Sequence, residues 1–346
     1  MLIYKKRKII ILIFFFIINS HGILMNLFFI FNVYIRNQNH NILIEIDTSL
    51  INSIKDGPAS FLKGLYKLLP YSSDKCCFIS SSFINPIFKP DFYYITASKL
   101  TQEQFDNLIK TKIINKYIFG PNLVPKKWDS FPNPNSWEEK RFIELLNLTK
   151  GMVVHSERVR DHLIQRTSTK NYIEKFKIIR ACSNLKPKKI NNFTERKIDI
   201  LFFEKYADFN HSNQAEKLLS LFKATRKNVV SMRYGSYNKN DLKKFANDSK
   251  FVIYFSFYDT GAIGLKEIQN YGVFAFTHQK DLVNDNKTCF LVQELTNKYD
   301  MKPAFNKILE IIDNISSKNP NSELIAKRNQ KINDCQNALE ALCKNL

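Results

Sequence analysis

The stretch D-T-G-A-I-G-L-K-E-I-Q-N-Y-G-V-F-A-F contains the residues of this chain whose types and spacing are best suited to chemistry. Its two carboxylates, Asp259 and Glu267, are separated by seven positions. These two carboxylates bracket a candidate ligand site. Between the two lies a turn that opens a predicted helix, where backbone N–H groups and the helix dipole favour a phosphate. The turn residues are Gly261, Ala262, Ile263 and Gly264.

Four residues elsewhere could complete such a site. Lys205 and Arg233 each follow a predicted strand. His155 ends another predicted strand, and ligands bind at the carboxyl ends of strands in open sheets. Gly57 lies between the first predicted strand and its helix and could face a ligand. The plainer interpretations are a solvated lysine or arginine, a structural histidine and an ordinary turn glycine.

The elements that must position these residues alternate between strand and helix. Around the two carboxylates, residues 251–257 predict a buried strand, residues 262–271 a helix and residues 273–276 a second strand. The other predicted strands are 41–47, 76–80, 92–96, 117–119, 151–155, 176–180, 198–203, 228–232 and 289–292. The other predicted helices are 59–69, 100–110, 137–148, 157–165, 213–223, 240–247, 301–315 and 322–343. This alternation predicts an α/β protein with a parallel sheet in each of two halves.

The N-terminus predicts a membrane anchor. A basic cluster at residues 5–8 is followed by residues 9–35, which contain no Asp, Glu, Lys or Arg. About 20 apolar residues span a bilayer as a helix, and the basic cluster should stay cytoplasmic. We therefore expect a single-pass membrane protein whose remaining chain lies in the Golgi or ER lumen, if the source is eukaryotic. The alternative is a cleaved signal peptide over residues 9–18 and secretion, but this would leave residues 23–35 as an exposed apolar tail.

Six Asn-x-Ser/Thr sequences fit a lumenal glycoprotein. They begin at Asn147, Asn192, Asn210, Asn247, Asn286 and Asn314.

Composition limits the partners. The 346 residues carry a formal charge of +20, which suggests anionic partners such as nucleotide phosphates or lipid head groups. The basic residues are spread along the chain without a recognition motif, so we expect no nucleic-acid partner. None of the six cysteines has the C-x2-C spacing of a zinc site, and no D-x-D motif stands out. We therefore expect no metal.

The stretch around the two carboxylates resembles the donor-site motif of GT-B glycosyltransferases, especially the retaining family-four type. That motif has two acidic residues separated by seven positions, small residues between them and a glycine before the next strand, here Gly272. The resemblance implies two Rossmann-like domains that face each other across a cleft. It also implies that Asp259 contacts the donor sugar, Glu267 the ribose and the N–H groups of residues 261–264 the diphosphate. The family usually has Glu at the first acidic position, and both Arg and Lys after the first strand of the second domain, where this chain offers only Lys205. By this resemblance, Lys205 and Arg233, which follows the next strand, could supply the cations that neutralise the charge of the departing diphosphate.

With this resemblance, the chain divides into five parts. We expect a cytoplasmic tail and signal-anchor at 1–36, an acceptor domain at 37–183, a linker at 184–195, a donor-binding domain at 196–318 and a C-terminal helix at 319–346. The implied function is metal-independent transfer of a sugar from a nucleotide-sugar co-substrate to a glycan, lipid or protein acceptor, with no resident cofactor. The alternative is a catalytically inactive GT-B-like protein that binds glycans or serves as a scaffold. A third class is a different nucleotide-binding enzyme on a doubly wound fold. Within that class a dinucleotide oxidoreductase is disfavoured, because no G-x-G-x-x-G follows the first strand.

Overall fold

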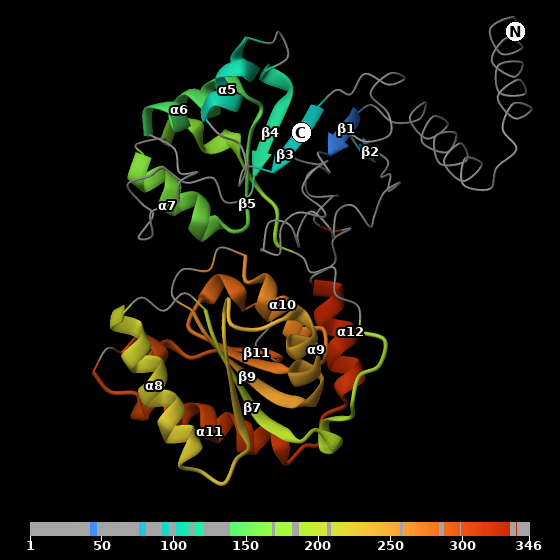
Figure 1. Cartoon of the computed structure of the whole chain (residues 1–346), viewed down its shortest axis with the longest axis vertical. Helices are drawn as coiled ribbons and strands as arrows, with labels where there is room; N and C mark the ends of the chain where they lie inside the picture. The colour runs from blue at the N-terminus through green and yellow to red at the C-terminus, as the bar shows by residue number, and fades with distance from the viewer. Residues whose placement is uncertain are drawn as a thin grey trace, which may run out of the picture.

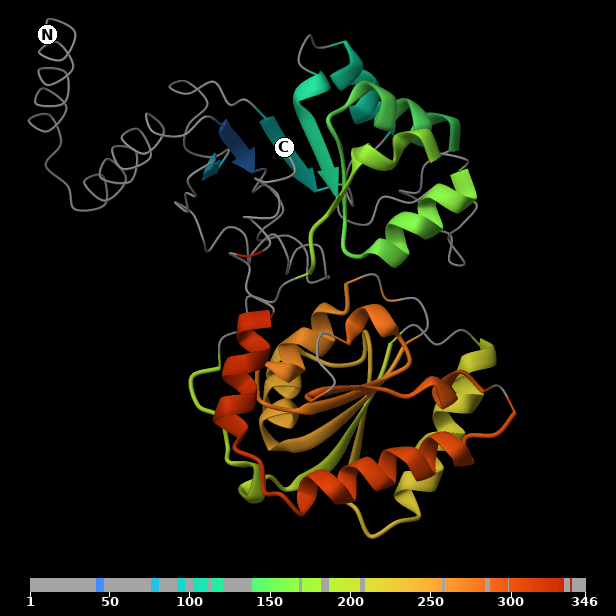
Figure 2. The same ribbon diagram turned by 180° about the vertical axis from the view of Figure 1, so that it is seen from behind.

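The computed structural model describes two sheets and the helices that cover them (Figures 1 and 2). The described residues are 42–46, 76–80, 92–96, 102–110, 114–120, 139–167, 170–181, 187–205, 209–256, 259, 261–283, 287–297, 299–332 and 337. The expected anchor at residues 9–35, Gly57 and the expected helix at 59–69 lie outside them. Within the part that is described, none of the helices has both the length and the hydropathy that crossing a bilayer requires.

The first half contains a parallel sheet with the strand order β2-β1-β3-β4-β5-β6. Its strands are β1 (Ile42–Ile46), β2 (Cys76–Ser80), β3 (Phe92–Thr96), β4 (Tyr117–Gly120), β5 (Gly151–Val154) and β6 (Phe176–Ile178). Its described helices are α5 (Gln102–Ile109), α6 (Glu139–Leu148) and α7 (Glu157–Thr167). The core of this half joins strand residues such as Phe119 and Val154 to helix residues such as Phe142 and Leu163.

The second half contains a parallel sheet with the strand order β11-β10-β9-β7-β8. Its strands are β7 (Ile198–Glu204), β8 (Val229–Arg233), β9 (Ser249–Phe255), β10 (Phe274–Thr277) and β11 (Cys289–Leu291). Its helices are α8 (Phe209–Lys223), α9 (Lys239–Asp248), α10 (Ile263–Gln269), α11 (Lys302–Ser316) and α12 (Ser322–Ile332). The α/β class and the parallel sheet in each half, expected from the alternation of elements, are confirmed.

Both faces of the second sheet are covered, because residues along each strand point alternately to opposite sides. Ile200 and Phe202 of β7 pack in one core with residues of α8 and α11. Leu201 and Phe203 pack in the other core with residues of α9 and α10. Figure 1 shows α8 and α11 on one side of the sheet and α9 and α10 on the other. This two-sided burial explains why the strands are continuous apolar runs rather than alternating ones.

The strand order creates a switch point between β7 and β9. From β7 the chain crosses to β8 on one side, then returns through α9 to β9 on the other side of β7. In sheets of this kind, ligands bind outside the carboxyl ends of the strands at such a point. The N–H of Lys205, just after β7, donates to the carbonyl of Phe255 at the end of β9, with a distance of 2.9 Å. The topology therefore places Lys205 at the expected ligand position.

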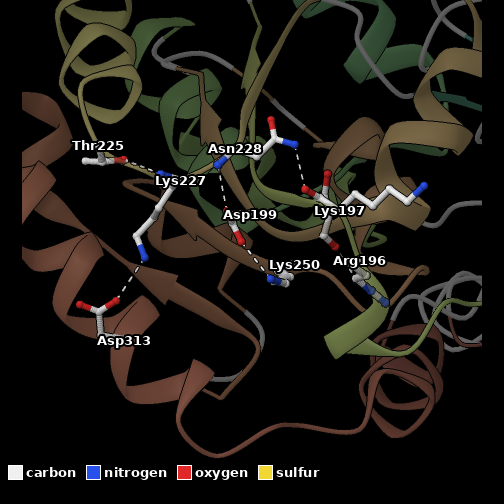
Figure 3. A network of polar contacts seen from close by, with 9 residues as sticks. Arg196, Lys197, Asp199, Thr225, Lys227, Asn228, Lys250 and Asp313 are labelled. Atoms are coloured by element: carbon white, nitrogen blue, oxygen red, sulfur yellow. Dashed lines mark hydrogen bonds and ion pairs between the residues drawn. The ribbon is translucent and has the colours of Figure 1, made fainter.

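A polar network lies at the amino ends of the strands of the second sheet, opposite their carboxyl ends (Figure 3). Asp199 accepts hydrogen bonds from the N–H of Asn228 and from Lys250, each at 2.9 Å. Arg196 is buried and donates to carbonyls of Asn191, Ser249, Tyr271 and Gly272. Burial lowers the pKa of Arg196 to about 10, although Asp248 raises it. This network joins the segment before β7 to the second sheet. The carboxyl ends of the strands, at the other end of the sheet, are where a ligand site is expected.

Candidate functional site

A buried ion pair lies at the switch point. The Nζ atom of Lys205 is 2.7 Å from Oδ2 of Asp259, and the two side chains are 8% and 5% exposed. Tyr254 of β9 donates its hydroxyl to the same carboxylate oxygen. The Lys205 ammonium also lies 5.0 Å from the centre of the Tyr234 ring. Two of the residues singled out from the sequence, which come from different strand ends, are thus in direct contact.

The carboxylate of Asp259 is held in its charged form. Burial by itself would raise its pKa, but the charge of Lys205 and the hydrogen bonds from Lys205, Tyr254 and the Ala262 N–H together lower it. The N–H of Gly261 also points to this carboxylate, with a distance of 3.3 Å to Oδ1. Two of the four backbone donors expected to meet a phosphate, those of Gly261 and Ala262, are therefore engaged by Asp259.

The turn has a conformation unusual for its sequence. Ala262 has φ of 46° and ψ of 40°, the left-handed region that non-glycine residues rarely adopt. It is fully buried and directly precedes Ile263, the first residue of α10. Gly264 follows inside the helix, where an added Cβ would lie 3.5 Å from the Phe203 ring, an ordinary contact distance. Strain of this kind persists only where the surroundings impose it, and it is common at ligand sites.

Glu267 forms an ion pair with a second lysine, Lys239. Its carboxylate, 4% exposed, accepts hydrogen bonds from Lys239, whose Nζ lies 2.6 Å from Oε2. Lys239 is the first residue of α9 and is 48% exposed. Burial raises the pKa of Tyr237 and so, in smaller part, do the charges of Glu267 and Asp259. Glu267 itself lies on α10, the helix that begins directly after the turn beside Asp259.

His155 lies against the turn from the other half of the molecule. Its Nδ1 is 2.9 Å from the carbonyl of Ile179, and because a carbonyl only accepts, Nδ1 carries the proton. Burial lowers the pKa of His155, so the ring is neutral at pH 7. A Cβ added at Gly261 would lie 2.7 Å from Cδ2 of His155 and 3.0 Å from Cβ of Ala181. The first half therefore meets the second at Gly261.

Arg158 and Gln279 also belong to this junction, and the sequence did not reveal them. Arg158, in the first turn of α7, donates from Nη2 to the carbonyl of Asp259 at 2.8 Å and to Oε1 of Gln279 at 3.3 Å. Gln279 is buried just after β10 and donates to the carbonyl of Ser256. A search for polar residues within the first turn of each helix that follows a strand would have found Arg158 three positions after His155.

The remaining expected residues lie apart from the buried pair. Arg233 forms an ion pair with Glu204, with 3.0 Å between Nε and Oε2, and its side chain is 56% exposed. It ends β8 at the same carboxyl edge as Lys205. Gly57 lies outside the described residues. No group of three or more His, Cys, Asp or Glu side chains that could hold a metal ion occurs among the residues described, and metal independence stays a prediction.

Comparisons with known proteins find similar structures but no sequence relative. No protein-family model matches the chain, and no curated protein matches it significantly. The solved structure of TarM matches with 15% identity and a TM-score of 0.48, over 82% of this chain and 58% of TarM. The lipopolysaccharide outer core galactosyltransferase WaaB matches with 9% identity and a TM-score of 0.49, over 88% of this chain and 99% of WaaB.

A third match is UDP-GlcNAc 2-epimerase from Neisseria meningitidis bound to UDP-GlcNAc, with 10% identity and a TM-score of 0.43, over 87% of this chain and 99% of that one. Solved glycosyltransferase structures are thus among those that the chain resembles, as the motif predicted. The family-four assignment is not tested by them. The identities and TM-scores are low, and the matched structures include both a transferase and an epimerase. The reaction must therefore be inferred from the residues of this chain.

Proposed function

We propose that the protein is a glycosyltransferase that moves a sugar from a nucleotide-sugar donor to a glycan, lipid or protein acceptor without a metal. The observation that carries this proposal is the buried Lys205–Asp259 pair at the switch point between β7 and β9. A nucleotide sugar presents hydroxyl groups and a diphosphate that are joined through a single glycosidic oxygen. A carboxylate and an ammonium group in contact with each other match those two neighbouring groups.

In the proposed reaction, the two members of the pair exchange partners when the donor binds. Asp259 accepts hydrogen bonds from sugar hydroxyls, and Lys205 turns to the diphosphate. As the bond between the sugar and the diphosphate breaks, the leaving group gains charge, and a preorganised cation lowers the barrier. Tyr254 keeps Asp259 oriented throughout, since it is bonded to the carboxylate without the donor.

The other residues have supporting roles in this proposal. Glu267 holds the ribose hydroxyls, and Lys239 acts as its counter-ion. The N–H groups at the start of α10, from Ile263 and Gly264, have no partner inside the helix and face the diphosphate. Arg233 supplies a second cation at the same edge. The neutral ring of His155, with its proton on Nδ1, presents Nε2 as an acceptor for a sugar hydroxyl rather than as a cation.

The proposed location is a lumenal one, with residues 9–35 as a single-pass anchor in the Golgi or ER membrane of a eukaryotic cell, or a secreted one if the segment is cleaved. Asn147, Asn192 and Asn314 are exposed, so they are accessible for glycosylation. Expression of the full chain in a eukaryotic cell should give a mass that a glycosidase reduces. A protein of unmodified mass whose large domain is digested by protease from the cytosolic side would refute the lumenal location.

A screen of nucleotide sugars tests the activity. Incubation of the full chain with each donor should release free nucleotide from one of them, and Glu267→Gln should abolish this release while circular dichroism shows an intact fold. Glu310→Gln, on α11, is a matched control and should keep the activity of the wild type.

The second candidate, a non-catalytic glycan-binding protein, is favoured by a specific observation. Asp259, Glu267 and two of the turn's N–H groups already have partners inside the protein. Tight glycan binding by calorimetry without turnover of any donor would support this candidate and refute the first.

A further inference from the structure

The contacts of Arg158 connect the two halves at the turn that holds Asp259. Arg158 belongs to α7 of the first half, and two of its acceptors lie 101 and 121 positions further along the chain, after β9 and β10 of the second half. In these two contacts the guanidinium is the charged group, because one acceptor is a main-chain carbonyl and the other is an amide oxygen. Each contact is therefore a charge-assisted hydrogen bond that does not require a buried counter-ion.

The acceptors of Arg158 are themselves held. Gln279 donates from Nε2 to the carbonyl of Ser256, so Arg158 reaches both ends of the loop between β9 and the turn. Asp259 accepts from Arg158 through its carbonyl and from Lys205 through its carboxylate. The peptide unit and the side chain of Asp259 are thus fixed by two different cations, one from each half of the molecule.

A second contact lies next to the first. His155 and Ala181 of the first half approach Gly261 so closely that a Cβ there would lie within 3.0 Å of both. Asp259, whose carbonyl accepts a hydrogen bond from Arg158, is 4% exposed beside this contact.

We propose that Arg158 is a positioning residue that couples the approach of the first half to the geometry of Asp259. This inference rests on the proposed glycosyltransferase function. Arg158 touches neither the sugar nor the phosphate. It pulls the carbonyl of Asp259 toward α7 on closure and so aims the carboxylate. Closure of the halves and alignment of the sugar then become one event rather than two independent ones.

The proposal predicts a particular kinetic change. Since Arg158 acts only in the closed state, Arg158→Ala should lower kcat about five-fold, the effect of one charge-assisted hydrogen bond at an exposed position. KM should stay the same or fall, because an open protein admits the donor more easily. Arg158→Lys keeps a charge and one donor group and should recover part of the loss. Gln279→Leu should also lower kcat. In the double variant Arg158→Ala/Gln279→Leu, the fold-loss of kcat should be smaller than the product of the two single fold-losses.

Arg160→Ala is the matched control. It removes the same kind of side chain two positions away on α7, where Arg160 is bonded to its neighbour Asp161 at 2.8 Å. Its kcat and KM should equal those of the wild type. Arg158 is exposed, so its replacement leaves no cavity in the core and the fold should persist.

Hydrogen exchange separates failure of this inference from failure of the proposed function. In the ligand-free full chain, the amides of residues 261–263 should exchange about five-fold faster in Arg158→Ala than in the wild type or Arg160→Ala. Unchanged exchange would overturn the proposal whether or not the protein turns over a donor. Faster exchange with wild-type kcat and KM would overturn the coupling to catalysis. Faster exchange in a protein that turns over no donor would support the contact of Arg158 with the turn. It would refute the coupling of that contact to sugar transfer, together with the proposed function.

Discussion

Replacement of Gly261 by alanine should push the two halves of the molecule apart without unfolding either. The added methyl group would lie 2.7 Å from Cδ2 of His155 and 3.0 Å from Cβ of Ala181, whereas ordinary contacts begin at 3.4 Å. The neighbours must therefore give by about 0.7 Å and 0.4 Å. His155 cannot rotate away cheaply, because it is buried and its Nδ1 is bonded to the carbonyl of Ile179.

The cost of such overpacking is typically about 1–3 kcal/mol. Each half has its own core, so the overlap is relieved most easily by separation at this junction. A cost of about 1.4 kcal/mol corresponds to a ten-fold shift toward the separated arrangement. We expect a similar ten-fold loss of donor turnover, together with a larger radius of gyration in solution scattering. The thermal unfolding of the Gly261→Ala protein should change little.

Gly264→Ala is the control, since it adds the same methyl group three positions further along. There the new Cβ would lie 3.5 Å from the Phe203 ring, and alanine is favoured over glycine inside a helix by roughly 0.5–1 kcal/mol. This variant should match the wild type in scattering and be slightly more stable. For Gly261→Ala, a scattering profile equal to that of Gly264→Ala, with the turnover of the wild type, would refute the close approach at Gly261.

Three further predictions concern charge. Lys205→Met leaves the Asp259 carboxylate buried without its cation and should lower the free energy of unfolding by about 3–5 kcal/mol in urea denaturation. The double variant Lys205→Met/Asp259→Asn should recover part of this loss. A smaller loss than in Lys239→Met would contradict the burial of the pair. Lys239→Met should lower the free energy of unfolding by less than Lys205→Met, because Lys239 is half-exposed and solvent screens its attraction to Glu267, yet it should change nucleotide affinity measured by calorimetry. Burial lowers the pKa of His155 from its ordinary value of 6.5, so the unfolded chain binds a proton more readily than the folded protein does. The free energy of unfolding should therefore fall as the pH drops below 6.5, and this part of the pH profile should be absent in His155→Gln.

Much of the fold could be predicted because buried parallel strands are continuous apolar runs. The strands at 76–80 and 92–96 have the bounds that the sequence predicts. The start of β9 was placed two residues late, since Ser249 and Lys250 are polar and look like loop residues. In the structure the Ser249 hydroxyl is bonded to the carbonyl of Phe245 and Lys250 is paired with Asp199. A pattern of hydropathy cannot show that a polar side chain has found a partner.

The candidate site was predictable only where a residue follows a strand directly. Lys205 and His155 were found in this way, because the carboxyl ends of parallel strands meet at one edge. Arg158, Lys239 and Gln279 were missed. In a chain with 52 lysines and arginines, a single one carries no signal, and these contacts form only when distant segments come together. The lysine that pairs with Glu267 and the arginine that binds the carbonyl of Asp259 therefore required the structure.

The separation of the cores has a consequence for how such a protein can change over time. The cluster in the first half draws its residues from Phe105 to Phe176, and the two clusters in the second half draw theirs from Phe193 to Ile325. No buried apolar residue of these clusters serves both halves. Substitutions that reshape one half are therefore not penalised by the packing of the other, and natural selection can alter what one half recognises while the other keeps its ancestral ligand.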